Sequence, residues 1–153
     1  MVRAHPGTLM VNHERCRFCN LSSEEIIKEN KYARLFLSNP RKVKGHFLVI
    51  PKRHVEKPWK LTKEEINSVF QLIFYIQKLL SEKFEGGCDI KQHYRPFVKE
   101  NNIKVDHVHF HVYPRQFKDE LYQKVEKFET DLFIPLSKKE QQKIFSTIIN
   151  GKK

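Results

Sequence analysis

His107-Val108-His109-Phe110-His111-Val112-Tyr113 alternates strictly between polar rings and apolar side chains. This period of two predicts a half-buried strand, with its apolar side toward a core and its histidines on an open surface. Residues on one face of a strand lie roughly 7 Å apart, so neighbouring histidines could share one small ligand, but His107 and His111 could not reach one ion together. A single such histidine would be an incidental polar residue. Three in alternation indicate a functional site.

Further strands are expected on both sides of a long helix. Residues 32–38 and 46–51 are rich in strand-forming side chains, and a proline closes each segment. Thr62-x-x-Glu65 is a capping box, and the apolar residues after it recur at spacings of three and four, which predicts an amphipathic helix of about six turns. We expect Gly86-Gly87 to end this helix in the left-handed conformation. Residues 88–98 then predict a strand that a short turn joins to the histidine strand.

Shorter helices are predicted elsewhere in the chain. Ser22-x-x-Glu25 is a second capping-box pattern and predicts a helix over residues 23–29. A further helix is expected over residues 117–128. Ser137-x-x-Glu140 should cap a last helix that ends near Gly151.

Together these elements predict an α+β fold, in which an antiparallel β-meander sheet carries the long helix on one face. Residues 1–14 contain a Pro-Gly pair and no periodicity, and we expect them to form a flexible N-terminal arm. Residues 15–116 would form the domain around the histidines. Residues 117–153 would form a C-terminal helical extension.

The chain is strongly basic, because 29 Lys and Arg residues outnumber 18 Asp and Glu residues, for a formal net charge of +11. Such an excess favours polyanionic partners, whether nucleotides, polyphosphates or nucleic acid. The lysines are spread along the whole chain, however, so a solvated basic surface explains the charge equally well, and nucleic acid is the less favoured partner. No signal segment and no run suited to a membrane span is seen, which favours the cytoplasm.

Three cysteines do not form an extracellular disulfide framework, but two of them are paired as Cys16-x-x-Cys19. Two thiolates at this spacing make half of a tetrahedral zinc site, which two imidazoles would complete. The alternative is a pair of free thiols. A redox role is disfavoured because no thioredoxin-like βαβ pattern follows. Cys88 has no partner in the sequence, and we expect it in the core.

The histidine stretch resembles the His-x-His-x-His signature of the histidine-triad (HIT) family of nucleotide hydrolases and nucleotidyl transferases. Pro114-Arg115 follows it, as it often does in that family. Gly45-His46-Phe47-Leu48-Val49-Ile50-Pro51-Lys52-Arg53-His54-Val55 is similar to the family's Gly-His-x-Leu-Val-x-Pro strand and the turn after it. The resemblance covers residues 16–115. It implies a HIT domain over residues 15–116 that pairs into a homodimer.

The resemblance also implies roles for individual residues. His109 would attack the α-phosphorus of a nucleotidyl substrate and carry the nucleotidyl group covalently, since a neutral imidazole is a nucleophile near neutral pH. His111 would bind the phosphate and fix the tautomer and charge of the nucleophile. Further contacts to the nucleotide and its phosphates would come from His46, Lys104, Ser38 and Asn39. The ligands of a closed, structural zinc site would be Cys16, Cys19, His54 and His107.

The chain departs from the family pattern just before the first triad histidine. Most members have a glycine there, followed by Gln and then Ser or Thr, whereas this chain has Asn102, Ile103 and Lys104. Lys104 could supply the lost phosphate contact as a point charge. Three functions stay open. They are hydrolysis or transfer of a nucleotidyl group from dinucleoside polyphosphates, nucleoside phosphoramidates or nucleotide sugars, removal of an adenylyl group from a nucleic-acid end, and non-catalytic nucleotide binding.

Overall fold

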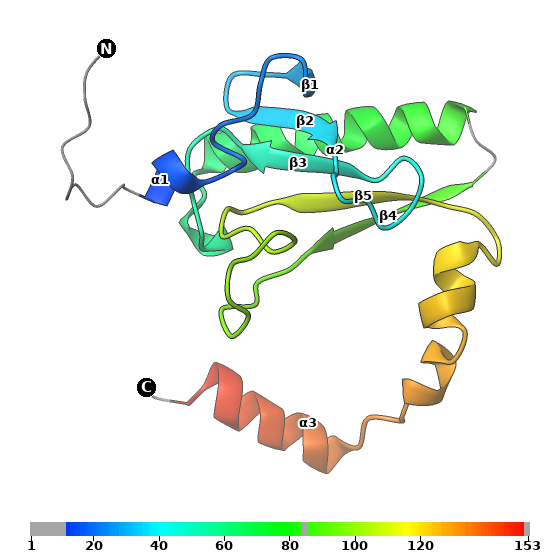
Figure 1. The fold of residues 1–153 in the computed structure, drawn as a ribbon. Coiled ribbons are helices and arrows are strands. Elements are labelled where there is room, and N and C mark those ends of the chain that lie inside the picture. Colours follow the sequence, from blue (N-terminus) through cyan, green and yellow to red (C-terminus); the bar gives the residue numbers. More distant parts are fainter. Residues whose placement is uncertain (1–11, 84–85, 152–153) are drawn as a thin grey trace. The chain divides into compact units, whose positions relative to one another are not determined.

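The computed structural model describes residues 12–83 and 86–151. The chain divides after Phe117 into two compact units, and the N-terminal unit contains a five-stranded sheet and the long helix α2 (Lys63–Lys83) (Figure 1). Most of the predicted N-terminal arm, residues 1–11, lies outside the described residues. The described part of it belongs to a one-turn helix, α1 (Asn12–Arg15). Within the described ranges, no helix is long and apolar enough to cross a membrane.

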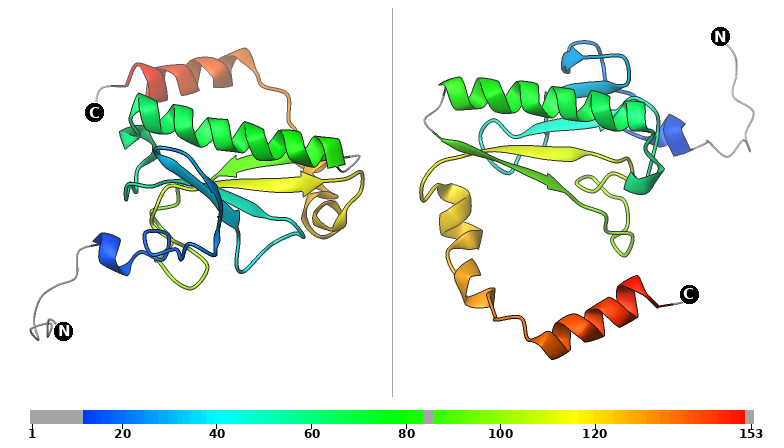
Figure 2. Two further views of the ribbon diagram at one scale, coloured as in Figure 1. Left: turned by 90° about the horizontal axis from the view of Figure 1, so that it is seen from above. Right: turned by 180° about the vertical axis from the view of Figure 1, so that it is seen from behind.

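The sheet is antiparallel at every pairing and has the strand order β1-β2-β3-β5-β4. Its strands are β1 (Ile26–Glu29), β2 (Ala33–Leu37), β3 (Phe47–Pro51), β4 (Gly87–Gln92) and β5 (Phe110–Arg115). The predicted α+β fold, an antiparallel sheet with a long helix on one face, is confirmed (Figure 2). After α2 the chain first forms the edge strand β4 and then returns, so that β5 lies between β3 and β4.

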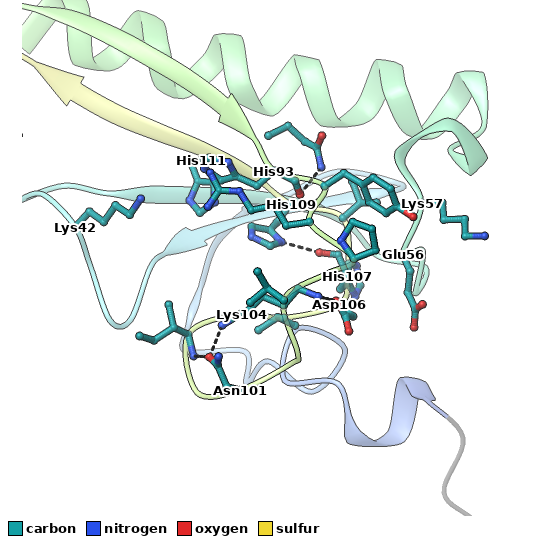
Figure 3. A pocket seen from close by; sticks show the side chains of 18 residues that line it. Lys42, Glu56, Lys57, His93, Asn101, Lys104, Asp106, His107, His109 and His111 are labelled. Carbon is teal, nitrogen blue, oxygen red and sulfur yellow. Dashed lines mark hydrogen bonds and ion pairs between the residues drawn. The ribbon is translucent and has the colours of Figure 1, made fainter. Parts of the chain in front are cut away.

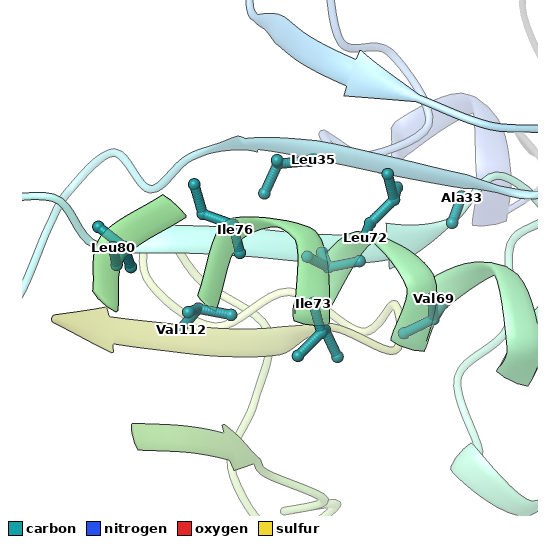
Figure 4. Close-up of a cluster of buried hydrophobic side chains, with 9 residues drawn as sticks. Ala33, Leu35, Val69, Leu72, Ile73, Ile76, Leu80 and Val112 are labelled. Atoms are coloured by element: carbon teal, nitrogen blue, oxygen red, sulfur yellow. The ribbon is translucent and has the colours of Figure 1, made fainter. Parts of the chain in front are cut away.

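The two faces of the sheet have separate clusters of buried side chains. Helix α2 covers one face, as its apolar spacing predicts (Figure 4). This first cluster comprises Ala33, Leu35, Val49, Val69, Leu72, Ile73, Ile76, Leu80 and Val112. Alternate residues of β2 and β3 point to the opposite face and pack with the segment around Cys16. This second cluster comprises Cys16, Phe18, Phe36, Leu48, Ile50 and Val105.

The predicted alternation holds along β5 itself. Val112 is buried in the α2 cluster, whereas His111 lies opposite Leu48, a residue of the second cluster. The strand begins only at Phe110, however, so His107 and His109 precede it. The strand predicted over residues 88–98 is likewise shorter and ends at Gln92. The short turn expected between the two strands is therefore wrong, and residues 93–109 form a long connection instead.

The glycines after α2 act differently from the prediction. Helix α2 reaches Lys83, the last described residue before the gap, and neither Gly86 nor Gly87, the first described residues after it, has a positive φ. A Cβ atom at Gly86 would lie 2.1 Å from the carbonyl oxygen of Arg115, so a side chain there would collide with β5. Gly86 is thus required by the close approach of two backbones, and the predicted left-handed stop is wrong.

The helix predicted over residues 23–29 is also wrong, because β1 occupies most of this segment. The capping contact itself forms, since the backbone N–H of Ser22 donates to Glu25 Oε2 at 2.9 Å. It closes a turn, and the β-branched residues Ile26 and Ile27 then enter the strand that pairs with β2. Pairing with the sheet edge outweighs the local helix signal.

The C-terminal unit consists of short helical segments. These are a π-helical turn at Tyr122–Glu126, a 3₁₀ turn at Glu129–Leu132, α3 (Lys138–Ile144) and a second π-helical turn at Phe145–Ile149. The helix predicted over residues 117–128 is thus shorter and wound differently. The predicted cap is confirmed, because the hydroxyl of Ser137 accepts the N–H of Glu140 at 3.1 Å.

A buried carboxylate fixes the start of α2, and its loss should lower stability. Glu65 accepts two bonds from the Arg53 guanidinium, at 2.7 and 3.0 Å, and one from the N–H of Thr62 at 2.9 Å. We expect Glu65→Gln to lower the free energy of unfolding at pH 7 by about 2 kcal/mol, since the charge of a half-exposed Arg53 loses its partner. Urea denaturation would measure this loss. Glu64→Gln, an exposed change in the same turn, serves as the control.

The stabilising contribution of Glu65 should depend on pH in one direction. The hydrogen bonds from Arg53 and from Thr62 lower the pKa of the Glu65 carboxyl below its ordinary value. The ionised form therefore stabilises the folded state above the unfolded pKa of about 4.3, and the contribution is lost as the pH falls below it. A difference between wild type and Glu65→Gln that did not shrink on acidification would contradict this assignment.

Candidate active site and metal centre

Four histidine rings meet on the sheet face opposite α2. The ring centroid of His111 lies 4.9 Å from that of His109 and 5.1 Å from those of His46 and His93. A cavity of about 560 Å³ opens over this group, and Figure 3 shows labelled imidazoles at its centre. Its lining includes His93, His107, His109 and His111 together with the cations Lys42, Lys57, Arg95 and Lys104. The volume is that of an ordinary small-molecule site.

His109 has one ring nitrogen engaged and one free to react. Its Nδ1 lies 2.6 Å from the carbonyl oxygen of His107, and a carbonyl can only accept, so Nδ1 carries the proton. The lone pair of a neutral ring is then on Nε2. Burial lowers the pKa of His109, and the charge of Lys104 lowers it further, which favours the neutral ring. This is the protonation state that a nucleophilic imidazole requires.

His46 and His111 form a relay that also fixes a tautomer. The backbone N–H of Lys42 donates to Nδ1 of His46 at 3.1 Å, so His46 carries its proton on Nε2. That Nε2 lies 2.9 Å from Nδ1 of His111 and donates to it. His111 therefore presents an Nε2–H donor. Burial lowers the pKa of His46 to about 4 and, with the charges of His109 and His46, brings that of His111 far below its ordinary value.

His93 is a member of this group that the sequence patterns do not reveal. It follows β4, which pairs with β5 such that Lys91 lies opposite His111. Its Nε2 is buried and has no hydrogen-bond partner among the described residues. Burial, followed by the charge of Arg95, lowers its pKa and favours the neutral form. The alternation of residues along β4 would have placed it beside His111, but only once the pairing of the two strands was known.

Of the other predicted nucleotide contacts, Lys104 lies in the cavity lining, whereas Ser38 and Asn39 do not. Lys104 lines the cavity, where its ammonium group pairs with the carboxylate of Asp106. Ser38 and Asn39 are not among the lining residues. The hydroxyl of Ser38 donates to the carbonyl of Pro40 at 2.8 Å, and its N–H donates to the carbonyl of His46. Ser38 thus belongs to the turn before His46, and a nucleotide contact for it and for Asn39 stays a prediction.

Next to the cavity, the four predicted metal ligands come together. Their ligand atoms all lie within 4.8 Å of one another, in the group Cys16, Cys19, His54 and His107. Nδ1 of His107 lies 3.4 Å from Sγ of Cys16, and Nδ1 of His54 lies 3.4 Å from Sγ of Cys19. Tetrahedral zinc, with bonds of about 2.3 Å to sulfur and 2.0 Å to nitrogen, would require S···N separations of about 3.5 Å. The spacing is therefore compatible with a metal site.

The outer contacts of the two imidazoles fit metal binding as well. Nε2 of His107 donates to the carbonyl of Pro51 at 2.8 Å, and Nε2 of His54 lies 3.3 Å from a carboxylate oxygen of Glu56. Each ring thus turns its Nδ1 lone pair toward the thiols, and such oxygen partners are typical of metal-binding histidines. His107 also links the two sites, because its carbonyl holds Nδ1 of His109.

An imidazole with a free ring nitrogen in a basic cavity defines a candidate centre for nucleophilic attack on a phosphorylated substrate. The chain belongs to the HIT family, because the HIT domain model matches residues 21–118. The family predicted from the histidine stretch is thereby confirmed.

Similar proteins agree with this assignment. The chain is 29% identical over 131 residues to the protein hit of Bacillus subtilis (80% of this chain, 86% of the relative). It is also 29% identical to adenosine 5′-monophosphoramidase hnt1 of Schizosaccharomyces pombe (65% and 74%), and 34% identical to bis(5′-adenosyl)-triphosphatase of Dictyostelium discoideum (54% and 58%). A crystal structure of a HIT family protein from Bacillus anthracis superimposes with a TM-score of 0.67 at 26% identity, covering 92% of this chain and 99% of that one.

Proposed function

We propose that this protein hydrolyses or transfers a nucleotidyl group through a covalent intermediate on His109. The observation that carries the proposal is the bond from His109 Nδ1–H to the carbonyl of His107, which directs the lone pair to Nε2. Nε2 attacks the α-phosphorus, and the bond from phosphorus to the leaving group breaks with its electron pair on the leaving group. Water or another acceptor then attacks the same phosphorus. The P–N bond breaks, and Nε2 recovers its lone pair.

The neighbouring groups would stabilise the phosphate during both steps. His111 offers an Nε2–H donor, and Lys42 and Lys104 supply positive charge in the cavity. Donors already held in place for the charge that develops in the transition state are a large source of rate enhancement. Lys104 would supply, as a point charge, the phosphate contact that Gln and Ser or Thr make in the family pattern. Its ammonium group would then be shared between the phosphate and Asp106.

The names of the relatives support a choice of substrates. Among them are an adenosine 5′-monophosphoramidase and a bis(5′-adenosyl)-triphosphatase, whose substrates both carry an adenosine α-phosphate. We therefore propose nucleoside phosphoramidates and dinucleoside polyphosphates as the substrate classes of this chain. The predicted homodimer and cytoplasmic location stay predictions.

We further propose that the Cys16, Cys19, His54 and His107 group holds structural zinc. Four protein ligands would close the coordination sphere, so the metal would supply cross-linking and not a reactive water. It would tie the turn at Cys16 to the segment that precedes β5, and through His107 it would steady the nucleophile.

Direct assay of purified protein tests the proposed function. We expect adenosine 5′-phosphoramidate and diadenosine triphosphate to be hydrolysed with AMP as a product. A rapid denaturing quench at alkaline pH, where a P–N bond to imidazole is stable, should trap an adenylyl adduct visible by intact mass. Binding of both compounds without turnover would establish the non-catalytic alternative. Activity confined to a nicked, 5′-adenylated duplex would establish the nucleic-acid alternative.

A further inference from the structure

The cavity extends beyond the histidines to a region that the proposed reaction leaves without a role. Figure 3 shows Lys42 on one side of the labelled histidines and Lys57 on the other. The lining also includes Tyr94 and Arg95, from the start of the long connection between β4 and β5. An amine leaving group, as in a phosphoramidate, would be too small to use these side chains.

An exposed aromatic pair borders this region. The rings of Trp59 and Tyr94 meet edge to face with centroids 4.9 Å apart, and Nζ of Lys57 lies 6.0 Å from the Trp59 centroid. Trp59 is 63% exposed, so its indole contributes little to the core of the fold. The 3₁₀ turn Pro58–Lys60 that carries it is held by Arg53, which donates to the carbonyl of Lys60 at 3.1 Å. The indole is therefore displayed from an anchored turn.

Two cations beside the aromatic pair are available to a ligand. Within the described part of the chain, neither Lys57 nor Arg95 forms an ion pair, whereas Lys104 is paired with Asp106. The carboxylate of Glu56 lies against His54. Aromatic faces next to free cations are the combination that binds a nucleobase together with its phosphates.

We propose that Trp59, Tyr94, Lys57 and Arg95 form a second nucleotide subsite that binds the leaving group. The inference rests on the proposed function, in which the first nucleotide is transferred to His109. In-line displacement requires the leaving group to depart on the side opposite the attacking nitrogen. The leaving nucleotide would place its phosphates against Lys57 and Arg95 and stack its base on the ring of Tyr94, which lines the cavity, with the perpendicular ring of Trp59 beside it. When the bond from the α-phosphorus to the bridging oxygen breaks, that nucleotide retains the oxygen and the electron pair.

The first test compares two substrates that differ only in the leaving group. We expect Tyr94→Ala to lower the ratio of kcat/KM for diadenosine triphosphate to kcat/KM for adenosine 5′-phosphoramidate by about 10-fold, the typical effect of losing one stacked base. Phe97→Ala is the matched control, because Phe97 is an exposed ring of the same connection and does not line the cavity. The same ratio in wild type and Tyr94→Ala would overturn the subsite.

The second test does not depend on turnover. Trp59 is the single tryptophan of the chain, so tryptophan emission reports on this position alone. In His109→Ala, which should bind without cleaving, we expect diadenosine triphosphate to quench the emission in a saturable manner, and AMP at saturation to leave it nearly unchanged. Equal quenching by both, or calorimetric binding of the dinucleotide with no quenching, would overturn the proposal. Tighter binding of a single-stranded oligonucleotide than of the dinucleotide would assign the surface to nucleic acid and overturn it too.

The two proposals fail in distinguishable ways. If neither substrate is turned over and no adduct forms on His109, the proposed function fails. Only the second subsite is overturned if adenosine 5′-phosphoramidate is hydrolysed through an adduct, diadenosine triphosphate leaves the Trp59 emission unchanged, and Tyr94→Ala leaves the ratio of the two kcat/KM values unchanged.

Discussion

Replacement of His109 with alanine is expected to lower kcat for nucleotidyl hydrolysis by a factor of about 10³ or more, because it removes the only atom that is proposed to bond to phosphorus. The fold should be unaffected. The His109 ring lies at the edge of the second buried cluster, against Phe18, and among the described residues its hydrogen bond is the one that Nδ1–H donates to the carbonyl of His107. Steady-state hydrolysis of adenosine 5′-phosphoramidate measures the loss. Intact mass after a rapid quench should show the adenylyl adduct in wild type and none in the variant.

The variant His111→Ala distinguishes the role of the nucleophile, His109, from that of its neighbour, His111. His111 contributes a hydrogen-bond donor, and removal of one such donor typically costs about 10²-fold in kcat. We therefore expect a slower enzyme that still forms the adduct, in contrast with His109→Ala. An adduct that persisted in His109→Ala, or one that disappeared only in His111→Ala, would transfer the nucleophile's role to another histidine.

Removal of the proposed metal should have the second large effect, and its main consequence should be a lower thermal stability of the fold. A zinc ion would join Cys16 to His107, residues 91 positions apart, and so restrict the unfolded chain. A ligand present at a thousand times its Kd contributes about 4 kcal/mol to folding. We expect a strong chelator, or Cys16→Ser, to lower Tm by roughly 10 °C or more. Differential scanning calorimetry with metal analysis measures both loss of stability and loss of zinc.

The third cysteine provides the control for this experiment. Cys88 is half-buried against the α2 cluster and lies outside the proposed metal group, so Cys88→Ser should retain one zinc per chain. Activity supplies an additional readout, since kcat should fall with zinc content as the His107 carbonyl loses its fixed position next to His109. A protein purified without metal, with a Tm indifferent to chelator and to added zinc, would establish the alternative of two free thiols.

Local periodicity in the sequence was sufficient for the main elements, and the resemblance of the histidine stretch to a known signature indicated the family. Alternation placed Val112 toward the helix and His111 toward the opposite face, because successive side chains of any strand point in opposite directions. Spacings of three and four located α2, whose buried residues form the core with the sheet. The capping boxes at Thr62 and Ser137 were equally readable, since each depends on contacts within one turn.

Local signals misled where a distant strand competed with them. Residues 23–29 carry a helix-capping pattern, yet Ile26–Glu29 pairs with β2. Gly86 suggested a left-handed turn, yet its role is to admit the backbone of Arg115. In both places the deciding contact comes from another segment of the chain, so no window of neighbouring residues contains the information.

The sequence by itself was enough to identify the alternating histidines, the amphipathic helix and the Cys16-x-x-Cys19 spacing, because each is a pattern contained within a short run of residues. Only the tertiary structure decided that His93 adjoins His111, that His107 joins the metal group to the carbonyl bond of His109, and that Trp59 meets Tyr94 beside the cavity. These juxtapositions depend on the strand order, on the pairing register and on the path of residues 93–109. Sheet register and packing are set by the whole domain at once. The tautomers of His46, His109 and His111 depend on hydrogen-bond partners that this packing supplies, so the sequence alone does not define them.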